Sequence, residues 1–583
     1  MDFKSSCSLY FFKMGKLFLL FGLLFSTPLF CQKEDNVWVF GYRYNEPLAN
    51  GIYFYFNDSL EVVYKKKPME INDSNASICD SLGNLLIYTN GCYVEKYDGE
   101  SIPGSQGLNP GKLYDVQCLN NQGYNTPQSI MLLPDPLIEF QYHLFHIPTT
   151  IADGIAFDYG ILHSIVDLSL NNNEGGMIVK NDTLVLDLPS NDGMHAVRHA
   201  NGRDWWILGA QRYSNLYYTF LLTQNGIQKS EQLIGDSLAI DASGEMCFSP
   251  DGSKFARFDC KNGLHLFDFD RCSGILSNSI AIPHVQDGTQ VNRYAGLAWS
   301  ADGRFLYMGC SSKIYQIDMQ APDLEASRQL VLQYDSENYC FLNSNFLWME
   351  LGPDGVIYSR PGNGTTCMNR INHPERAGIA CAGQQKAFSF DYAYKNIPHF
   401  PNFRLGPIDG SACDTLGINN VPLAGWRYER PAVLTVDFTS VSWYEPTQWY
   451  WTFGDGTTST DRNPQHVYDT PGPYPVCLTV SNANGSDTKC KTVWVTTTAT
   501  DAPIPAHEER VFFPNPSSGV VSWSGAAEGS FFVSVYNALG QCVLQTKTAA
   551  QQVDLSGFPA GLYHIRLLPE GSDKMVMGKV ILE

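Results

Sequence analysis

The segment FSPDGSKFARF, residues 248–258, joins two aromatic runs through an Asp-Gly pair, which is typical of a tight β-hairpin. The pattern recurs in HANGRDWWILGA (199–210), WSADGRFLYMG (299–309) and LGPDGVIYSRP (351–361). The turn glycines Gly202, Gly252, Gly303 and Gly355 are 50, 51 and 52 residues apart. A β-rich repeat of this length predicts one blade of a β-propeller. A single small sheet cannot bury both of its faces alone, and neighbouring sheets in a ring cover them.

Weaker copies of the repeat precede these four, at 77–91 (SICDSLGNLLIYTNG) and 132–147 (LLPDPLIEFQYHLFHI). Residues 36–407 therefore have room for seven blades, with six as the alternative. The runs VWVFGYRY (37–44) and FSFDYAY (388–394) are candidates to complete one blade together and close the ring. Residues 149–193 are longer than one blade needs, and we expect a loop on one rim there.

The composition supports an all-β chain of several domains. At 583 residues the chain exceeds one ordinary hydrophobic core, and only 17% of its residues are charged, while it has 50 Gly, 33 Phe and 31 Tyr. Aromatic and β-branched runs interrupted by Gly, Asn and Asp favour strands over helices. The net charge of -20 argues against a nucleic-acid partner, whose phosphates would be repelled.

The N-terminus predicts export. Lys13 and Lys16 precede the apolar run LFLLFGLLFSTPLF (17–30), which has the length of a signal peptide, and we place the signal peptide at 1–31. No later segment is apolar enough to span a membrane. Two of the sixteen cysteines lie within 1–31, and in an exported chain the other fourteen favour disulfides over metal sites.

A second region, around WYWTFGDGTTST (449–460), predicts a sandwich rather than another blade. Residues 449–453 alternate as a strand with one buried face, and Asp455-Gly456 suits a tight turn. About seven short strands follow one another over residues 432–495, which is typical of an immunoglobulin-like fold. A phosphate-binding loop would need a lysine in this turn, and none is present.

Two cysteine pairs are candidates for disulfides. Cys477 and Cys490 flank the Asn484-Gly485 turn at similar distances on neighbouring predicted strands, and Cys260 and Cys272 flank the turn at 261–263.

The second region resembles a polycystic kidney disease (PKD) domain, which we place at 427–498 after a connector at 408–426. The resemblance rests on the Trp-x-Phe-Gly-Asp-Gly hairpin and a later His-x-Tyr, here Trp451, Phe453, Gly454, Asp455, Gly456, His466 and Tyr468. It implies that these residues shape the fold. No chemistry is implied for them.

The C-terminal residues 511–583, which follow a Thr/Ala/Pro-rich linker at 499–510, resemble the type A C-terminal sorting domain of the type IX secretion system. The matching residues include Pro514, Asn515, Pro516, Gly561, Tyr563 and Lys579. This resemblance implies that the secretion machinery is a partner, that the protein is secreted or held at the outer-membrane surface, and that the domain is removed during export.

The turn sequences of the first region resemble Tol-type and WD-like propeller repeats. Together with FPNFRLGP (400–407), they resemble a family of exported Bacteroidetes propellers joined to a PKD domain.

Few residues qualify as chemical candidates. His195 and His199 are spaced like helical zinc ligands but lie in a predicted strand, and His143 and His146 should face opposite sides of a strand. Asp268 and Asp270 share a strand face and could bind calcium. No catalytic residue is nominated, and no other cofactor is expected.

Two functions remain open. The first is a secreted or cell-surface binding or adhesion protein whose propeller and PKD domain present a glycan- or protein-binding surface. The alternative is an exported hydrolase or lyase with its active site at the propeller centre. Converging Asp, Glu and His side chains with shifted pKa values would favour the enzyme.

Overall fold

The computed structural model describes residues 33–42, 49–57, 59–120, 122–152, 155–187, 189–238, 243–284, 294–335, 346–360, 364–496, 512–523, 530–537, 542–569 and 576–583. The predicted signal peptide (1–31) and linker (499–510) lie outside these ranges. Strands dominate the described chain, so the all-β prediction is confirmed.

Seven antiparallel sheets succeed one another in the described part of residues 37–394. The first two contain β1 (Val37–Phe40), β2 (Ala49–Phe56) and β3 (Leu60–Lys67), then β4 (Ala76–Cys79), β5 (Leu85–Thr89) and β6 (Val94–Lys96). The third and fourth contain β7 (Ile130–Pro134), β8 (Gln141–His146), β11 (Ile161–Asp167) and β12 (Gly176–Val185), then β13 (Pro189–Arg198), β14 (Trp205–Gln211), β15 (Leu216–Thr223) and β16 (Gly226–Leu233). The last three contain β17 (Glu245–Phe248), β18 (Lys254–Asp259), β19 (Gly263–Asp270) and β20 (Ile275–Ile282); β21 (Ala295–Trp299), β22 (Phe305–Cys310), β23 (Lys313–Asp318) and β24 (Gln329–Gln333); and β25 (Met349–Leu351), β26 (Ile357–Ser359), β27 (Thr365–Ile371) and β28 (Gly383–Tyr394).

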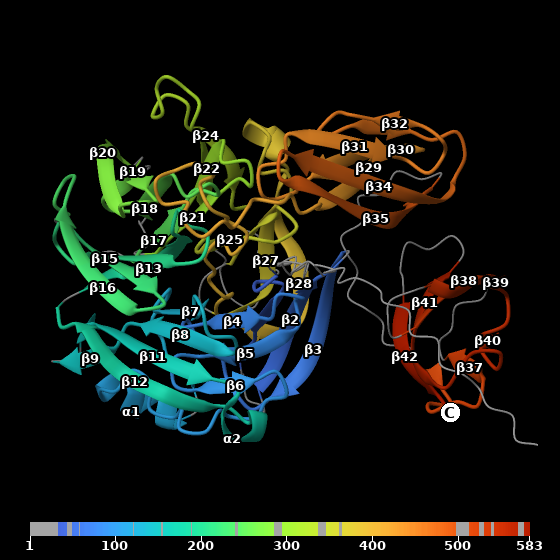
Figure 1. Cartoon of the computed structure of the whole chain (residues 1–583), viewed down its shortest axis with the longest axis horizontal. Coiled ribbons are helices and arrows are strands. Elements are labelled where there is room, and N and C mark those ends of the chain that lie inside the picture. Colours follow the sequence, from blue (N-terminus) through green and yellow to red (C-terminus); the bar gives the residue numbers. More distant parts are fainter. Residues whose placement is uncertain are drawn as a thin grey trace, which may run out of the picture. The chain divides into compact units, whose positions relative to one another are not determined.

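These sheets surround a common centre, with β4, β7, β13, β17, β21 and β25 innermost (Figure 1). The repeated hairpins fall where the sequence places them, each between the innermost strand of a sheet and the next strand outward. Their four turn glycines all have φ between 71° and 76°, a conformation that disfavours other residues. The propeller is thus evident. The number of blades stays a prediction, because the first two sheets have only three described strands each.

The ring closes through residues 395–404, which we call the closing segment. These residues run beside β1 in the opposite direction: Arg404 forms an ion pair with Asp35, and the Phe400 ring lies 5.8 Å from that of Trp38. The expectation that residues 37–44 and 388–394 share one blade was wrong. Residues 388–394 belong to β28 of the seventh sheet, and the stretch that follows them lies against β1.

The longer excursions between strands also differ from expectation. Residues 161–167, 176–185 and 189–193 belong to strands of the third and fourth sheets, while β9 (Thr149–Ala152) and β10 (Ile155–Asp158) form a separate hairpin. The larger excursion runs from residue 97 to 129 and contains α1 (Lys112–Gln117) and the 3-10 helix η1 (Cys118–Asn120). The remaining short helices are α2 (Leu170–Asn173) and η2 (Gly378–Cys381).

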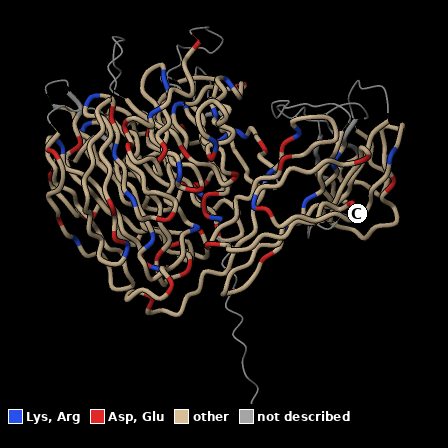
Figure 2. The backbone as a smooth tube through the Cα atoms, turned by 90° about the horizontal axis from the view of Figure 1, so that it is seen from above, with Lys and Arg blue, Asp and Glu red and all other residues tan. Residues whose placement is uncertain are grey.

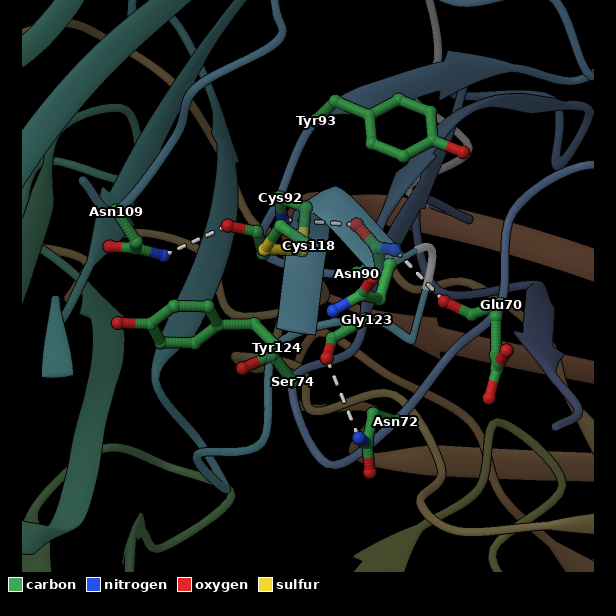
Figure 3. The surroundings of a disulfide bond; sticks show 12 residues. Glu70, Asn72, Ser74, Asn90, Cys92, Tyr93, Asn109, Cys118, Gly123 and Tyr124 are labelled. Carbon is green, nitrogen blue, oxygen red and sulfur yellow. Dashed lines mark hydrogen bonds between the residues drawn. A yellow bond between two sulfur atoms is a disulfide. The ribbon is translucent and has the colours of Figure 1, made fainter. Parts of the chain in front are cut away.

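A disulfide between Cys92 and Cys118 anchors that excursion, and buried amide side chains surround it (Figure 3). The Asn90 side chain accepts from the Cys92 N–H at 3.0 Å and donates to the Glu70 carbonyl at 2.9 Å. Asn109 donates to the Gly91 carbonyl at 3.1 Å. In these contacts, side chains provide the hydrogen-bond partners for backbone groups that have no neighbouring strand to pair with.

Two further sheets form the predicted sandwich. One contains β29 (Trp426–Ala432), β30 (Thr435–Ser440) and β33 (Gln465–Val467), and the other β31 (Gln448–Thr452), β32 (Thr458–Ser459), β34 (Gly472–Asn482) and β35 (Gly485–Val495). Trp426, Phe438, Trp451 and Phe453 fill the core between them. The immunoglobulin-like prediction is therefore confirmed.

The C-terminal region is a smaller sandwich around Trp523 and Ile565. Its sheets contain β36 (Phe512–Phe513), β37 (Val520–Trp523) and β40 (Gln552–Asp554), and β38 (Phe531–Asn537), β39 (Cys542–Thr548), β41 (Gly561–Pro569) and β42 (Val576–Leu582).

The matched sorting residues lie on or beside two strands of this sandwich. Gly561 begins β41, Tyr563 donates its buried hydroxyl to the Pro559 carbonyl at 2.8 Å, and Lys579 pairs with His564 in the sheet. The Asn515 side chain, in the Pro514–Pro516 segment, accepts from the Ile581 N–H at 3.0 Å.

The disulfides confirm one expected pair and correct the other. Cys477 and Cys490 are bonded, directly opposite each other on β34 and β35. The pairing of Cys260 with Cys272 was wrong, because the whole of β19 separates them, roughly 27 Å for eight extended residues. Cys260 is bonded instead to Cys310 at the end of β22. Cys272 is bonded to Cys413, so the predicted connector is fastened to the fifth sheet.

Charges are distributed along the whole chain. Asp and Glu are interspersed with Lys and Arg in Figure 2. The helices of the described ranges are all too short or too polar to cross a membrane.

Candidate functional site at the propeller centre

Carboxyl, imidazole and amide side chains meet where the innermost strands converge. His195 comes from β13, Glu245 from β17 and Glu350 from β25, while Gln128 precedes β7 and His399 belongs to the closing segment. Five separate parts of the propeller therefore supply this cluster, which we call the central cluster.

Glu245 connects its own strand, β17, to three other parts of the propeller. Its carboxyl accepts from the Leu297 N–H on β21, from the Met349 N–H on β25 and from the Gln128 amide. Desolvation raises the pKa of Glu245 well above its ordinary range, although these hydrogen bonds oppose the shift. The side chain therefore connects neighbouring inner strands, and burial favours its uncharged form.

Glu350 and His399 form a buried pair. Glu350 Oε2 lies 3.1 Å from His399 Nδ1 and accepts from the Phe400 N–H at 3.4 Å. Desolvation raises the pKa of Glu350 well above its ordinary value and lowers the pKa of His399 to about 4. The His195 ring lies 4.8 Å from that of His399, and burial also lowers the pKa of His195. Burial therefore disfavours charge on each of these side chains.

A pocket opens beside the central cluster. Its lining includes His195, Phe248, Trp299, Glu350, His399 and Phe400. Asp35 and Arg404 also border the pocket, joined by two hydrogen bonds that keep both charges paired. His399 Nε2 is buried without a hydrogen-bond partner. The Trp299 indole nitrogen is in the same state, so the pocket combines aromatic walls with two unsatisfied polar atoms, the composition expected of a small-molecule site.

The metal-ligand candidates are not brought together. His195 belongs to the central cluster, whereas His199 Nε2 lies 3.2 Å from the Cys272 carbonyl. His143 contacts His163 and Asp135, while His146 contacts Asn109 and Ser164. Throughout the described ranges, no group of three His, Cys, Asp or Glu side chains is arranged to hold a metal ion.

The calcium candidates are occupied by protein partners. Asp268 binds Lys254 and Asn278, and Asp270 binds Ser273 and the Cys272 N–H. The two carboxylates therefore serve separate local contacts, and calcium binding at this pair stays a prediction.

Sequence reasoning missed Glu245, Glu350 and His399. A signal was present, because each carboxylate interrupts an apolar inner strand shortly before a repeated turn, in GEMCFSPDG and WMELGPDG. Such positions face either a neighbouring blade or the centre, and periodicity alone does not say which.

The Gly-Asp-Gly turn of the second region serves the fold. Asp455 accepts from the N–H and hydroxyl of Thr457 and lies 2.6 Å from His466 Nε2. The His466 ring stacks on Phe453 at 4.1 Å. Every group of this hairpin is occupied locally, as the sequence predicted for a turn.

Two family models match the chain after its propeller. Residues 428–497 match the PKD domain, and residues 511–583 match the secretion system C-terminal sorting domain. The chain therefore contains a PKD domain and a type IX sorting domain. The type IX sorting domain marks it as secreted or outer-membrane surface material and implies contact with the secretion machinery.

Known proteins resemble parts of the chain. Collagenase ColA of Bacillus cereus is 55% identical over 42 residues, which is 7% of this chain and 4% of the collagenase. The PKD1 domain of the Vibrio cholerae metalloprotease PrtV is 32% identical and covers 14% of this chain and 100% of its own, with a TM-score of 0.13. The β-propeller domain of Cps50 from Myceliophteria thermophila is 10% identical and covers 55% of this chain and 93% of its own, with a TM-score of 0.32.

Proposed function

We propose that this protein binds a glycan or protein ligand at the cell surface or in the medium, with the propeller as the main binding domain and the PKD domain as a spacer or second binding module. The sorting domain supports the location. The observation that carries the binding role is the central cluster, whose acids and imidazoles bind one another beside an aromatic pocket.

This arrangement favours binding over catalysis for a physical reason. A general base must be unprotonated and within reach of the proton that it removes. Glu245 is engaged by three donors, and Glu350 is buried against His399. Both carboxyls are thus already held by groups of the protein, which suits a binding site better than a general base.

Binding is tested with the protein recovered after export. A glycan array and a panel of extracellular matrix proteins cover the two ligand classes. Saturable binding to members of either class, with a dissociation constant in or below the micromolar range, is the expected result. Failure to bind any member of both classes contradicts the proposal.

A hydrolase or lyase is the second candidate. The observation in its favour is the presence of two acids with raised pKa values and two histidines at one centre, since enzymes often shift pKa values where they do chemistry. Incubation with polysaccharide and ester substrates tests it. Product formation that disappears in Glu350→Gln would favour this candidate over the binding role.

The route of export is tested separately. We infer that the mature product runs from Gln32 to a point between Thr496 and Arg510, because the low-complexity stretch at 496–510 suits proteolytic cleavage. Removing residues 511–583 should leave folded protein in the periplasm. Intact-mass analysis of exported material checks the cleavage, and a secreted species that still carries Glu583 contradicts it.

A further inference from the structure

We propose that the pocket beside the central cluster holds one uncharged pyranose ring, the terminal sugar of a neutral glycan. This inference rests on the proposed binding function and names the ligand of its propeller. It is carried by the aromatic walls, by the unsatisfied imidazole nitrogen and by the charge balance around the pocket.

The walls suit a sugar ring. Phe248, Trp299 and Phe400 line the pocket from three parts of the propeller: β17, β21 and the closing segment. Aromatic faces pack against the C–H groups of a pyranose and shield them from water.

The polar groups suit hydroxyls. His399 Nδ1 is engaged by Glu350 and Gln128, while His399 Nε2 has no hydrogen-bond partner. A buried nitrogen in this state is unfavourable until a ligand satisfies it. A hydroxyl can donate or accept, so it satisfies His399 in either tautomer and can also contact the Glu350 carboxyl.

The charge balance disfavours ions. Arg404 is neutralised by Asp35, so no charge of either sign remains for a ligand to pair with there. Burial lowers the pKa of His195 and His399 and raises the pKa of Glu350, which disfavours charge on these groups as well. An acidic or amino sugar would lose its hydration without gaining a counter-charge.

The test compares sugars of one shape and different charge. The exported protein is titrated calorimetrically with glucose, galactose, mannose and N-acetylglucosamine, and then with glucuronic acid and glucosamine. At least one neutral sugar should bind, and at least ten-fold more tightly than both charged sugars. Tighter binding of a charged sugar, or no binding of any sugar, overturns the assignment.

Variants locate the binding. Trp299→Phe removes part of the wall, and Glu350→Ala removes the carboxyl, so each should weaken neutral-sugar binding at least five-fold. Trp348→Phe is the matched control: its indole N–H is also buried without a hydrogen bond, but it does not line the pocket. Equal affinity in folded Trp299→Phe and in the wild type overturns the assignment.

A second measurement needs no stable variant at Glu350. In the wild type, the indole N–H resonance of Trp299, assigned from its loss in Trp299→Phe, should shift as the neutral sugar is added. A stationary Trp299 signal during saturating binding overturns the pocket assignment. If glycans bind in that case, or if only a protein ligand binds, the proposed binding function still stands.

Discussion

Glu350 and Asp455 each meet a histidine, one at the propeller centre and the other in a surface hairpin of the PKD domain. Glu350 lies 3.1 Å from His399, and Asp455 lies 2.6 Å from His466. Desolvation raises the pKa of Glu350 far above its ordinary value. At Asp455 desolvation acts in the same direction, but hydrogen bonds from Thr457 and His466 outweigh it and lower the pKa to about 2.

The difference shows that burial, more than the identity of the partner, sets the state of such a pair. In the PKD domain the aspartate stays ionised because water and several donors stabilise its charge. In the propeller, burial favours the uncharged form of the glutamate. A carboxyl–imidazole contact therefore stabilises a turn in one domain and belongs to a buried polar cluster in the other.

The largest effect should come from Glu245→Ala. It removes the acceptor for two backbone N–H groups on β21 and β25 and for the Gln128 amide, all buried. We expect a loss of about 3–5 kcal/mol in the unfolding free energy of the propeller, measured by chemical denaturation. Glu245→Gln, which keeps one acceptor oxygen, is the control and should lose about 1 kcal/mol or less when both proteins are measured at pH 4.5. Equal losses in both variants would show that the hydrogen bonds contribute little.

The PKD domain contains a disulfide, Cys477–Cys490, whereas hydrogen bonds hold the central cluster together. Removing this disulfide tests how much it contributes to the stability of the PKD domain. The bond closes a loop with a sequence separation of 13, so the Cys477→Ser/Cys490→Ser variant should lose about 3 kcal/mol in the PKD transition. Peptide mapping of the non-reduced wild type serves as the control for the bond itself. A free Cys477 in that map contradicts the assignment.

The pH dependence of Glu245 should run opposite to that of Asp455. The folded-state pKa of Glu245 is raised, so its contribution to stability is full below the unfolded value of about 4.3 and is lost as pH rises toward the folded pKa. Glu245→Gln does not titrate. Above pH 4.5, the unfolding free energy of this variant relative to that of the wild type should therefore rise by up to about 1.4 kcal/mol per pH unit. A constant difference between pH 4.5 and 7 would refute the raised pKa.

The smallest effect belongs to Asp455→Asn. The folded-state pKa is lowered to about 2, so the contribution of Asp455 is present above the unfolded value of about 3.9 and is lost as pH falls toward 2. The pair is partly exposed, so we expect less than about 1 kcal/mol. Thermal melts of the PKD transition at pH 5 and pH 2.5 should converge for variant and wild type at the lower pH. Divergence there would contradict the lowered pKa.

The fold was readable from the sequence because local patterns specify it. The Asp-Gly and Asn-Gly pairs at a spacing of about 50 residues require hairpins, and all four turn glycines have positive φ in the structure. The alternation around Trp451 likewise predicts a strand with one buried face, and Trp451 is fully buried. Each of these signals depends on residues close together in sequence.

The central cluster was not readable, because it depends on residues far apart in sequence. Gln128 and Glu245 are 117 residues apart, and Gln128 and His399 are 271 apart. Spacing also misled the choice for Cys260, whose bonded partner Cys310 lies in the next sheet. Without the ring geometry, nothing in the sequence distinguishes a residue that faces the centre from one that faces a neighbouring sheet.

The closing segment also determines when the protein can be completed during export. Asp35 and Arg404 are 369 residues apart, so the first sheet leaves the inner membrane long before its partner. Until that partner arrives, Asp35 lacks its counter-charge and the Trp38 ring lacks its Phe400 neighbour. The entropic cost of closing a loop grows only slowly with its length. The long separation therefore affects when the ring closes more than how stable the closed ring is. A nascent chain interrupted before residue 404 would retain an open propeller, vulnerable to periplasmic proteases.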